Sequence, residues 1–469
     1  MPSRILLVSA NHCDTPDPVF PLGLAYLSAA LRGAGHECFW HDPLVESSSL
    51  EQTLRTWKPD YVGISLRNID DVLIRKQETF YNHPTSLVAA IRRQTVCPII
   101  LGGSGFSIFP KQLLELSQAD YGVAGEGENA LVSLIAALEG GKDFQSIPGL
   151  VFRQAGAVVT NRPRPAPPDQ ELCPAERPAR ITGHYLATTG MLNIQTQRGC
   201  AHRCCYCTYP LIEGREHRRQ AGDYVVEEFH QLQIMGARYA VIVDSVFNSS
   251  AGHVSEICEA LVRSGNQLPW GCFLRPQGLT PDLIRLMKRA GLAHIEFGSD
   301  SFCDEVLDSY GKDFTFEDVL RSSEMARKEG IDFCHFLIAG GPGERLQTLE
   351  RGFENSQRLA EATIMAVVGM RVYPGTKLYD WAIAEGQVSP GANLLMPTYY
   401  LAANLIEEEI FRRLRDYSSR SPSWIAGSPG HDYRNFVARL RQRGIVGPLW
   451  SYFSMLQRLG GGEFIRKLG

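Results

Sequence analysis

Long apolar runs are missing from this 469-residue sequence. A transmembrane helix needs roughly 20 consecutive apolar residues, and no stretch of the chain approaches that length. Residues 1–4 lead directly into the apolar run 5–8, which is too short to be the core of an export signal. These absences argue against a membrane-spanning or exported protein, and we expect a cytoplasmic location.

A strong excess of one charge is also missing. The formal net charge is -4, from 47 Lys and Arg against 51 Asp and Glu. Domains that bind nucleic acid usually carry a basic patch and a high isoelectric point, so nucleic acid is not the expected partner. The modest charge favours a small-molecule substrate, and the length predicts two or three domains.

Cysteine, by contrast, is not scarce: the chain has 12, and three of them form a Cys-x3-Cys-x2-Cys set at Cys200, Cys204 and Cys207. Thiolates suit iron–sulfur clusters, and three on one loop can bind three irons of a 4Fe–4S cube and leave the fourth iron open. Zinc usually takes four ligands in paired spacings. No second cysteine pair lies nearby, although His202 lies inside the loop. We therefore predict that these three cysteines are the metal ligands and that Cys205 is a bystander.

Strand and helix patterns alternate through residues 1–140. The expected strands are 4–9, 37–41, 61–65, 98–101 and 121–124, with a helix at 21–31. This alternation predicts an α/β fold with a doubly wound, Rossmann-like parallel sheet. The glycine-rich loops at 102–105 and 125–128 follow the last two strands, where such sheets bind ligands. Residues 141–190 are expected to form a hairpin (147–152 with 157–160) and then a stiff proline-rich linker at 161–168.

Residues 191–390 repeat the alternation, with expected strands at 192–197, 238–244, 268–274, 293–298, 331–339 and 365–372. Together with the helical patterns after them, they predict six βα units, which form a partial (βα)6 TIM-type barrel with its site at the carboxyl ends of the strands. Residues 391–469 are expected to be a helical extension, with helices near 404–417, 434–443 and 449–459.

The cysteine spacing, with the aromatic Tyr206 before the third cysteine, resembles that of the radical S-adenosylmethionine (SAM) superfamily. In that family the open iron binds the amino and carboxylate groups of SAM, and an electron from the cluster cleaves a carbon–sulfur bond to give a radical. The resemblance implies an electron donor such as flavodoxin or ferredoxin. It also implies that SAM contacts lie at the strand ends, on Asp244, Arg275, Glu296, Ser299, Ser301 and Arg371. The family's usual Gly-Gly-Glu is absent after the second barrel strand, so the contact to the SAM amino group stays open.

The first domain resembles the cobalamin-binding domain that is fused to many radical SAM enzymes. The matching stretches are residues 21–27, 62–65, 101–104 and 124–128. The resemblance implies that the loop with Gly102, Gly103 and Ser104 lies along the nucleotide tail of the corrinoid, with Gly125 and Glu126 as further contacts. Residues 66–70 would face the lower side of the ring. The Asp-x-His-x2-Gly motif of methionine-synthase-like domains is absent around His12, so a sheet that only shapes the active site is the competing interpretation.

The function that follows from these resemblances is that of a cobalamin-dependent radical SAM methyltransferase. Its expected cofactors are a 4Fe–4S cluster, SAM and cobalamin, and its expected substrate is a natural product or lipid with an unactivated carbon. Two alternatives stay open from the sequence. The same scaffold could transfer the 3-amino-3-carboxypropyl group of SAM or rearrange a ring, and an iron–sulfur protein could be a redox sensor without enzymatic activity.

Overall fold

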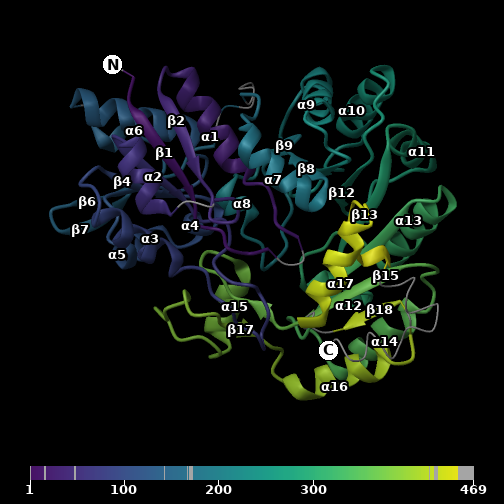
Figure 1. The fold of residues 1–469 in the computed structure, drawn as a ribbon. Coiled ribbons are helices and arrows are strands. Elements are labelled where there is room, and N and C mark those ends of the chain that lie inside the picture. The colour runs from purple at the N-terminus through teal and green to yellow at the C-terminus, as the bar shows by residue number, and fades with distance from the viewer. Residues whose placement is uncertain are drawn as a thin grey trace.

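The computed structural model describes residues 2–14, 17–46, 49–141, 143–165, 167, 173–421, 423–426 and 431–452. Two seven-stranded sheets form its framework. In Figure 1 the first sheet and its helices, in purple and blue, lie beside the second sheet, in teal and green. The yellow C-terminal elements lie against the second sheet.

The N-terminal sheet has the strand order β2-β1-β3-β4-β5-β6-β7. Its strands are β1 (Arg4–Ser9), β2 (Glu37–His41), β3 (Tyr61–Ser65), β4 (Ile99–Gly102), β5 (Tyr121–Val123), β6 (Leu150–Gln154) and β7 (Ala157–Thr160). The first five pair in parallel, which confirms the predicted doubly wound sheet. The strand order reverses between β1 and β3, and ligands of such sheets bind at this switch point.

Helices cover this sheet, as a parallel sheet requires. They are α1 (Leu22–Gly33), α2 (Leu50–Trp57), α3 (His83–Arg92), α4 (Ser104–Ile108), α5 (Pro110–Ser117) and α6 (Glu128–Gly140). Helix α1 packs with α6, and α3 packs with α2 and α5. Residues 5–8 of β1 are fully buried, because a continuous apolar strand loses contact with water on both faces when helices cover both.

The predicted hairpin forms from β6 and β7, and it extends the first sheet because β6 pairs antiparallel with β5. The short helix η1 (Phe144–Ser146) precedes it. The chain then reaches α7 (Ala179–Thr189), a helix that the sequence pattern did not reveal. Its buried residues are Ile181, Thr182, Tyr185 and Thr189, and the polar and β-branched residues among and around them obscure the apolar periodicity.

The second sheet has the order β18-β15-β14-β13-β12-β11-β8, with every pairing parallel. Its strands are β8 (Met191–Ile194), β11 (Tyr239–Ile242), β12 (Trp270–Leu274), β13 (Leu292–Asp300), β14 (Asp332–Ala339), β15 (Thr363–Val368) and β18 (Trp424–Ala426). The helices around it are α8 (Tyr209–Ile212), α9 (Gly222–Ile234), α10 (Ala251–Arg263), α11 (Pro281–Arg289), α12 (Asp304–Ser309), α13 (Phe316–Lys328), α14 (Leu346–Ser356) and α15 (Lys377–Ala384). All six predicted barrel strands are present.

The seventh strand, β18, comes from the extension that was expected to be helical. It pairs with β15 and so covers an edge whose N–H and C=O groups would otherwise lack partners in the sheet. Trp424 is buried there, with its ring against Phe353 and Tyr417. The short ladder of β16 (Met370–Arg371) and β17 (Tyr399–Tyr400) ties the extension to the end of the barrel.

Two helices of the extension are described, α16 (Glu407–Ser418) and α17 (His431–Gln442), close to the predicted 404–417 and 434–443. Of the third predicted helix, 449–459, residues 450–452 are helical and residues 453–459 lie outside the described residues. No helix within the described ranges is long and apolar enough to cross a bilayer.

A buried ion pair joins the two domains. The Nε of Arg371, in β16, donates a 2.8 Å hydrogen bond to Asp70, in the loop after β3, and both side chains are at most 3% exposed. Arg371 also donates to the carbonyl oxygens of Val372 and Leu394 at 2.7 Å. The side chain expected to contact SAM is therefore bonded to the first domain and to neighbouring backbone.

Substituting Arg371 by Met should destabilise the protein by about 3–5 kcal/mol, because the Asp70 carboxylate would stay buried without its cation. Urea unfolding followed by fluorescence measures the change. Arg358→Met is the matched control, since Arg358 forms an exposed 2.6 Å pair with Glu317 that should contribute less than about 1 kcal/mol. Equal losses in the two variants would contradict the assigned role of the buried pair.

Candidate active site between the two domains

The loop that carries the three cysteines begins at a turn that only glycine can make. β9 (Gln197–Arg198) pairs antiparallel with β10 (Arg218–Arg219), so the two ends of the loop lie next to each other. Gly199 has a φ of +87°, and a Cβ there would lie 2.0 Å from the carbonyl oxygen of Glu216. The next residue, Cys200, donates its N–H to Gly214 O at 3.0 Å. The turn therefore sets where the first cysteine stands.

The three cysteine thiols lie near one another, as ligands of one iron–sulfur cube must. Burial and the neighbouring thiols raise the pKa of Cys200, and they raise the pKa of Cys207 to about 12, so the three groups lie close enough to interact. Among the described residues, no three His, Cys, Asp or Glu side chains are grouped closely enough to hold one metal ion. In a cube each cysteine binds a different iron, which spaces the ligands more widely than a zinc ion does.

Two buried cations lie beside the cysteines, where they favour thiolates. Arg275 Nη1 is 3.9 Å from the Sγ of Cys204. Lys312 Nζ forms a 2.6 Å ion pair with Asp300, at the end of β13. Burial lowers the pKa of Lys312, but Asp300 and Cys204 outweigh burial, and the net pKa is raised. The Tyr206 hydroxyl also donates to Asp300, so the aromatic residue before the third cysteine is held by the barrel.

Most of the predicted SAM contacts are hydrogen-bonded to other groups of the protein. Asp244 is buried and accepts hydrogen bonds from the N–H and hydroxyl of Thr196 at 2.7 and 2.5 Å, so it holds the turn that leads into the cysteine loop. Ser299 bonds to His335 Nδ1 at 2.8 Å, and Ser301 accepts from the N–H of Cys303 at 3.2 Å. Glu296 accepts from Trp450 at 2.9 Å. With Arg371 paired to Asp70, the predicted contact whose side chain reaches a cluster cysteine is Arg275.

A cavity of about 630 Å³ lies between the two domains. The carboxyl ends of β1, β3 and β4 form one wall, and the barrel residues Gln195, Val243 and Phe273 belong to the other. All five residues predicted to contact cobalamin line it, namely Gly102, Gly103, Ser104, Gly125 and Glu126. The size and the strand-end position are typical of a cofactor site.

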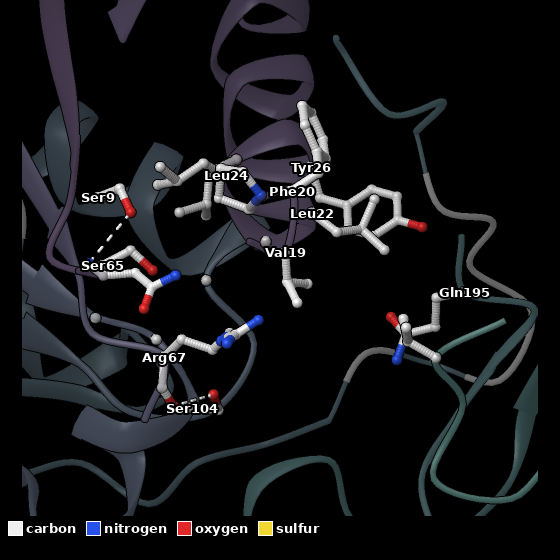
Figure 2. Close-up of a pocket in the computed structure, with 18 of the residues that line it drawn as sticks. Ser9, Val19, Phe20, Leu22, Leu24, Tyr26, Ser65, Arg67, Ser104 and Gln195 are labelled. Carbon is white, nitrogen blue, oxygen red and sulfur yellow. Dashed lines mark hydrogen bonds between the residues drawn. The ribbon is translucent and has the colours of Figure 1, made fainter. Parts of the chain in front are cut away.

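The first-domain wall of the cavity has features that fit a large ligand. Gly103 has a φ of +98°, and a Cβ there would lie 2.4 Å from Leu66 O, so backbone forms the surface at this point. Figure 2 shows Arg67 reaching into the cavity, with Gln195 on the opposite side. The buried Nε of Arg67 has no hydrogen-bond partner among the described residues, and burial lowers its pKa. His12 does not line the cavity and packs edge-on against His83 instead.

Four charged residues connect the cavity to the cysteine loop. Arg198 pairs with Glu128 at 2.6 Å and lies 3.7 Å from Glu126, which also accepts a bond from Arg218. Each of these side chains is at most 19% exposed. The sequence prediction included Glu126 but missed the two arginines, because residues about 70 to 90 positions apart become neighbours only through the fold.

The family comparisons agree with this arrangement. Residues 194–354 match the model of the Radical SAM superfamily, and residues 14–135 match the B12 binding domain. The chain thus contains a radical SAM domain with a B12-binding domain in front of it. Both domains lie where the cysteine spacing and the first-domain loops predicted them.

Individual relatives cover most of the chain. Tryptophan 2-C-methyltransferase of Streptomyces laurentii is 26% identical over 440 residues, covering 79% of this chain and 73% of the relative. Hopanoid C-3 methylase of Methylococcus capsulatus is 27% identical over 69% of this chain and 62% of its own length. The solved structure of the radical SAM methyltransferase TsrM from Kitasatospora setae, with cobalamin and a [4Fe-4S] cluster, has a TM-score of 0.86 at 23% identity and full coverage of both chains.

Replacing Cys200, Cys204 or Cys207 by Ala should abolish the 4Fe–4S absorption and electron paramagnetic resonance signals, because each removes one iron ligand. Cys205→Ala is the matched control. The Cys205 thiol lies 3.9 Å from Met370 Sδ in the core, and burial raises its pKa to about 12. This variant should keep the cluster. A cluster that survives in Cys204→Ala, with Cys205 as the substitute ligand, would overturn the assignment.

The ionisation of Asp244 should make folding pH-dependent. Burial raises its pKa from 3.8 to about 7, so the folded chain holds this proton more tightly than the unfolded chain does. Stability should therefore fall as the pH rises from about 4 to 7, by up to about 1.4 kcal/mol per pH unit. Urea unfolding of the apo-protein at several pH values, compared with Asp244→Asn, isolates this contribution. If the free energy of unfolding changed with pH in the same way in both proteins, Asp244 would not be the source of the pH dependence.

Proposed function

We propose that this protein is a cobalamin-dependent radical SAM methyltransferase that transfers a methyl group to a carbon atom of a small natural product or lipid. The observation that carries the proposal is the shared cavity. Its walls include the strand ends of the B12-binding domain, and also Arg198, Tyr209 and Glu213, which flank the cysteine loop. A methyl group held on one wall and a substrate on the other would therefore meet inside one enclosure.

The residues present suit this chemistry. When bound, cobalamin would carry the methyl group and SAM would donate it. The cluster together with SAM would supply reductive radical chemistry. The three cysteines would hold the cluster, Gly102, Gly103 and Ser104 would lie along the corrinoid, and Arg67 would face it. Apolar side chains such as Leu22, Val243 and Phe273 line much of the remaining cavity, which keeps water away from reactive species.

The relatives support methyl transfer as the reaction. Two of them are named as a tryptophan methyltransferase and a hopanoid methylase, so related chains methylate small molecules as different as an amino acid and a lipid.

We further propose that flavodoxin or ferredoxin reduces the cluster in the cytoplasm and that no nucleic acid takes part. The domain borders that we propose are residues 140, 190 and 390.

Anaerobic reconstitution with iron, sulfide and hydroxocobalamin tests the function. The purified protein should retain corrinoid absorption after gel filtration, and mass spectrometry should find S-adenosylhomocysteine formed from SAM. Methylthioadenosine would instead indicate aminocarboxypropyl transfer, and intact SAM in the reduced protein would indicate a sensor. Protein that binds no corrinoid would refute the proposal.

Gly103→Ala should lower cobalamin affinity at least tenfold, because the added Cβ displaces the Leu66 backbone that forms the cavity wall. Equilibrium dialysis with hydroxocobalamin measures the change. Gly183→Ala is the control, since Gly183 lies in α7 and a Cβ there would meet nothing within 4 Å. The control should bind as the wild type does, and equal affinity in both variants would contradict the site.

A further inference from the structure

The lumen of the barrel contains a carboxylate that forms no ion pair within the described part of the chain. Glu296, in β13, keeps part of its surface accessible and accepts one hydrogen bond, at 2.9 Å, from Trp450 Nε1. Within the described part of the chain, no Lys, Arg or His side chain forms an ion pair with it. Burial raises the pKa of Glu296, and the Trp450 hydrogen bond only partly opposes this. A carboxylate in such surroundings gains strongly from a bound cation.

The strand register places Glu296 inside the barrel and below the strand ends. It pairs with Phe273 of β12, and residues paired directly across neighbouring strands share one face of a sheet. Phe273 lines the cavity and is 37% exposed, and Glu296 lies beside it on the same face of the sheet without itself lining the cavity. β13 ends at Asp300, which puts Glu296 roughly 13 Å deeper along the strand than the residues around the cysteine loop.

Aromatic and apolar side chains surround this carboxylate. The rings of Phe273 and Phe336 lie with their centroids 6.4 Å apart at 34°. Met365 pairs with Phe336 in the next strand and is likewise partly exposed. Below Glu296, Trp450 stands edge-on to His294, which bonds to the hydroxyl of Tyr239 at 2.9 Å. His294 and Tyr239 lie near the amino ends of their strands, so these rings are on the side of Glu296 that points away from the strand ends.

We propose that Glu296 is a substrate-binding residue that binds a protonated amine of the substrate. The flat apolar body of the substrate would then pack against Phe273 and Phe336. The inference rests on the proposed function and narrows it, because a neutral lipid would leave the carboxylate without a cation. Glu296 is then not a SAM contact. The cations and thiols beside the cysteine loop lie at the strand ends, roughly 13 Å along β13 from Glu296.

Equilibrium dialysis of the reconstituted holoprotein with two probes tests the inference. Tryptamine and 3-ethylindole share the indole body and differ by the amine. The wild type should bind tryptamine at least about tenfold more tightly, because a charge-assisted hydrogen bond forms only with the amine. Glu296→Gln keeps an acceptor for Trp450 but removes the charge, so it should bind both probes equally, with the affinity for 3-ethylindole unchanged.

Trp450→Phe is the matched control, since it removes the hydrogen bond and keeps the carboxylate. It should retain the preference for tryptamine. A purely structural Glu296 would change the melting temperature of Glu296→Gln and leave the probe ratio as in the wild type, which would overturn the inference. Failure of both probes to bind the wild type would overturn it as well.

Two further measurements distinguish the amine site from a SAM contact at Glu296 and from the proposed methyl transfer. The dissociation constant of SAM should be the same in Glu296→Gln and the wild type, and a weakened SAM complex with an unchanged probe ratio would restore the SAM assignment. Absence of S-adenosylhomocysteine, together with intact tryptamine selectivity, would count against methyl transfer and not against the amine site.

Discussion

The buried ion pairs of Arg198 and Arg218 with Glu126 and Glu128 are the interaction on which the rest of this site depends. Glu128 begins α6, Glu126 lies in the loop just before this helix, and the arginines flank the cysteine loop. Buried charges are tolerated only when they are paired, so the two loops are stable together in one arrangement. That arrangement makes the strand ends of one domain and the cysteine loop of the other into walls of a single cavity.

A second buried pair, Asp70 with Arg371, acts at another edge of the same interface. Asp70 follows the loop that carries Arg67, so this pair also fixes the side of the cavity that Arg67 enters. Two domains held at two buried points enclose a space whose lining is largely apolar. Such an enclosure suits a reaction in which a reactive carbon must meet a methyl group rather than water.

In the barrel, the existing partners of a side chain decide whether it can bind a ligand. Asp244, Ser299 and Arg371 all stand near strand ends, where radical SAM enzymes bind their cofactor, yet each is already bonded to a protein group. Glu296 also accepts a hydrogen bond, from Trp450, but it lies deeper and forms no ion pair with any residue that the structure describes. The sequence pattern placed Glu296 correctly inside β13, whereas Asp244 lies two residues after β11 and Arg371 lies in β16, separate from β15. The pattern also could not distinguish a residue that holds the fold from one that can bind a ligand.

The sequence by itself determined the class of the protein and most of its framework. The cysteine spacing, the order of apolar strands and the glycine loops are local patterns, so they could be read without knowing the fold. Only the tertiary structure decided which residues meet. The arginine–glutamate network, the seventh strand β18 and the contact of Trp450 with Glu296 join segments far apart in the chain. The energy of such contacts depends on burial and distance, and neither quantity can be read from the sequence alone.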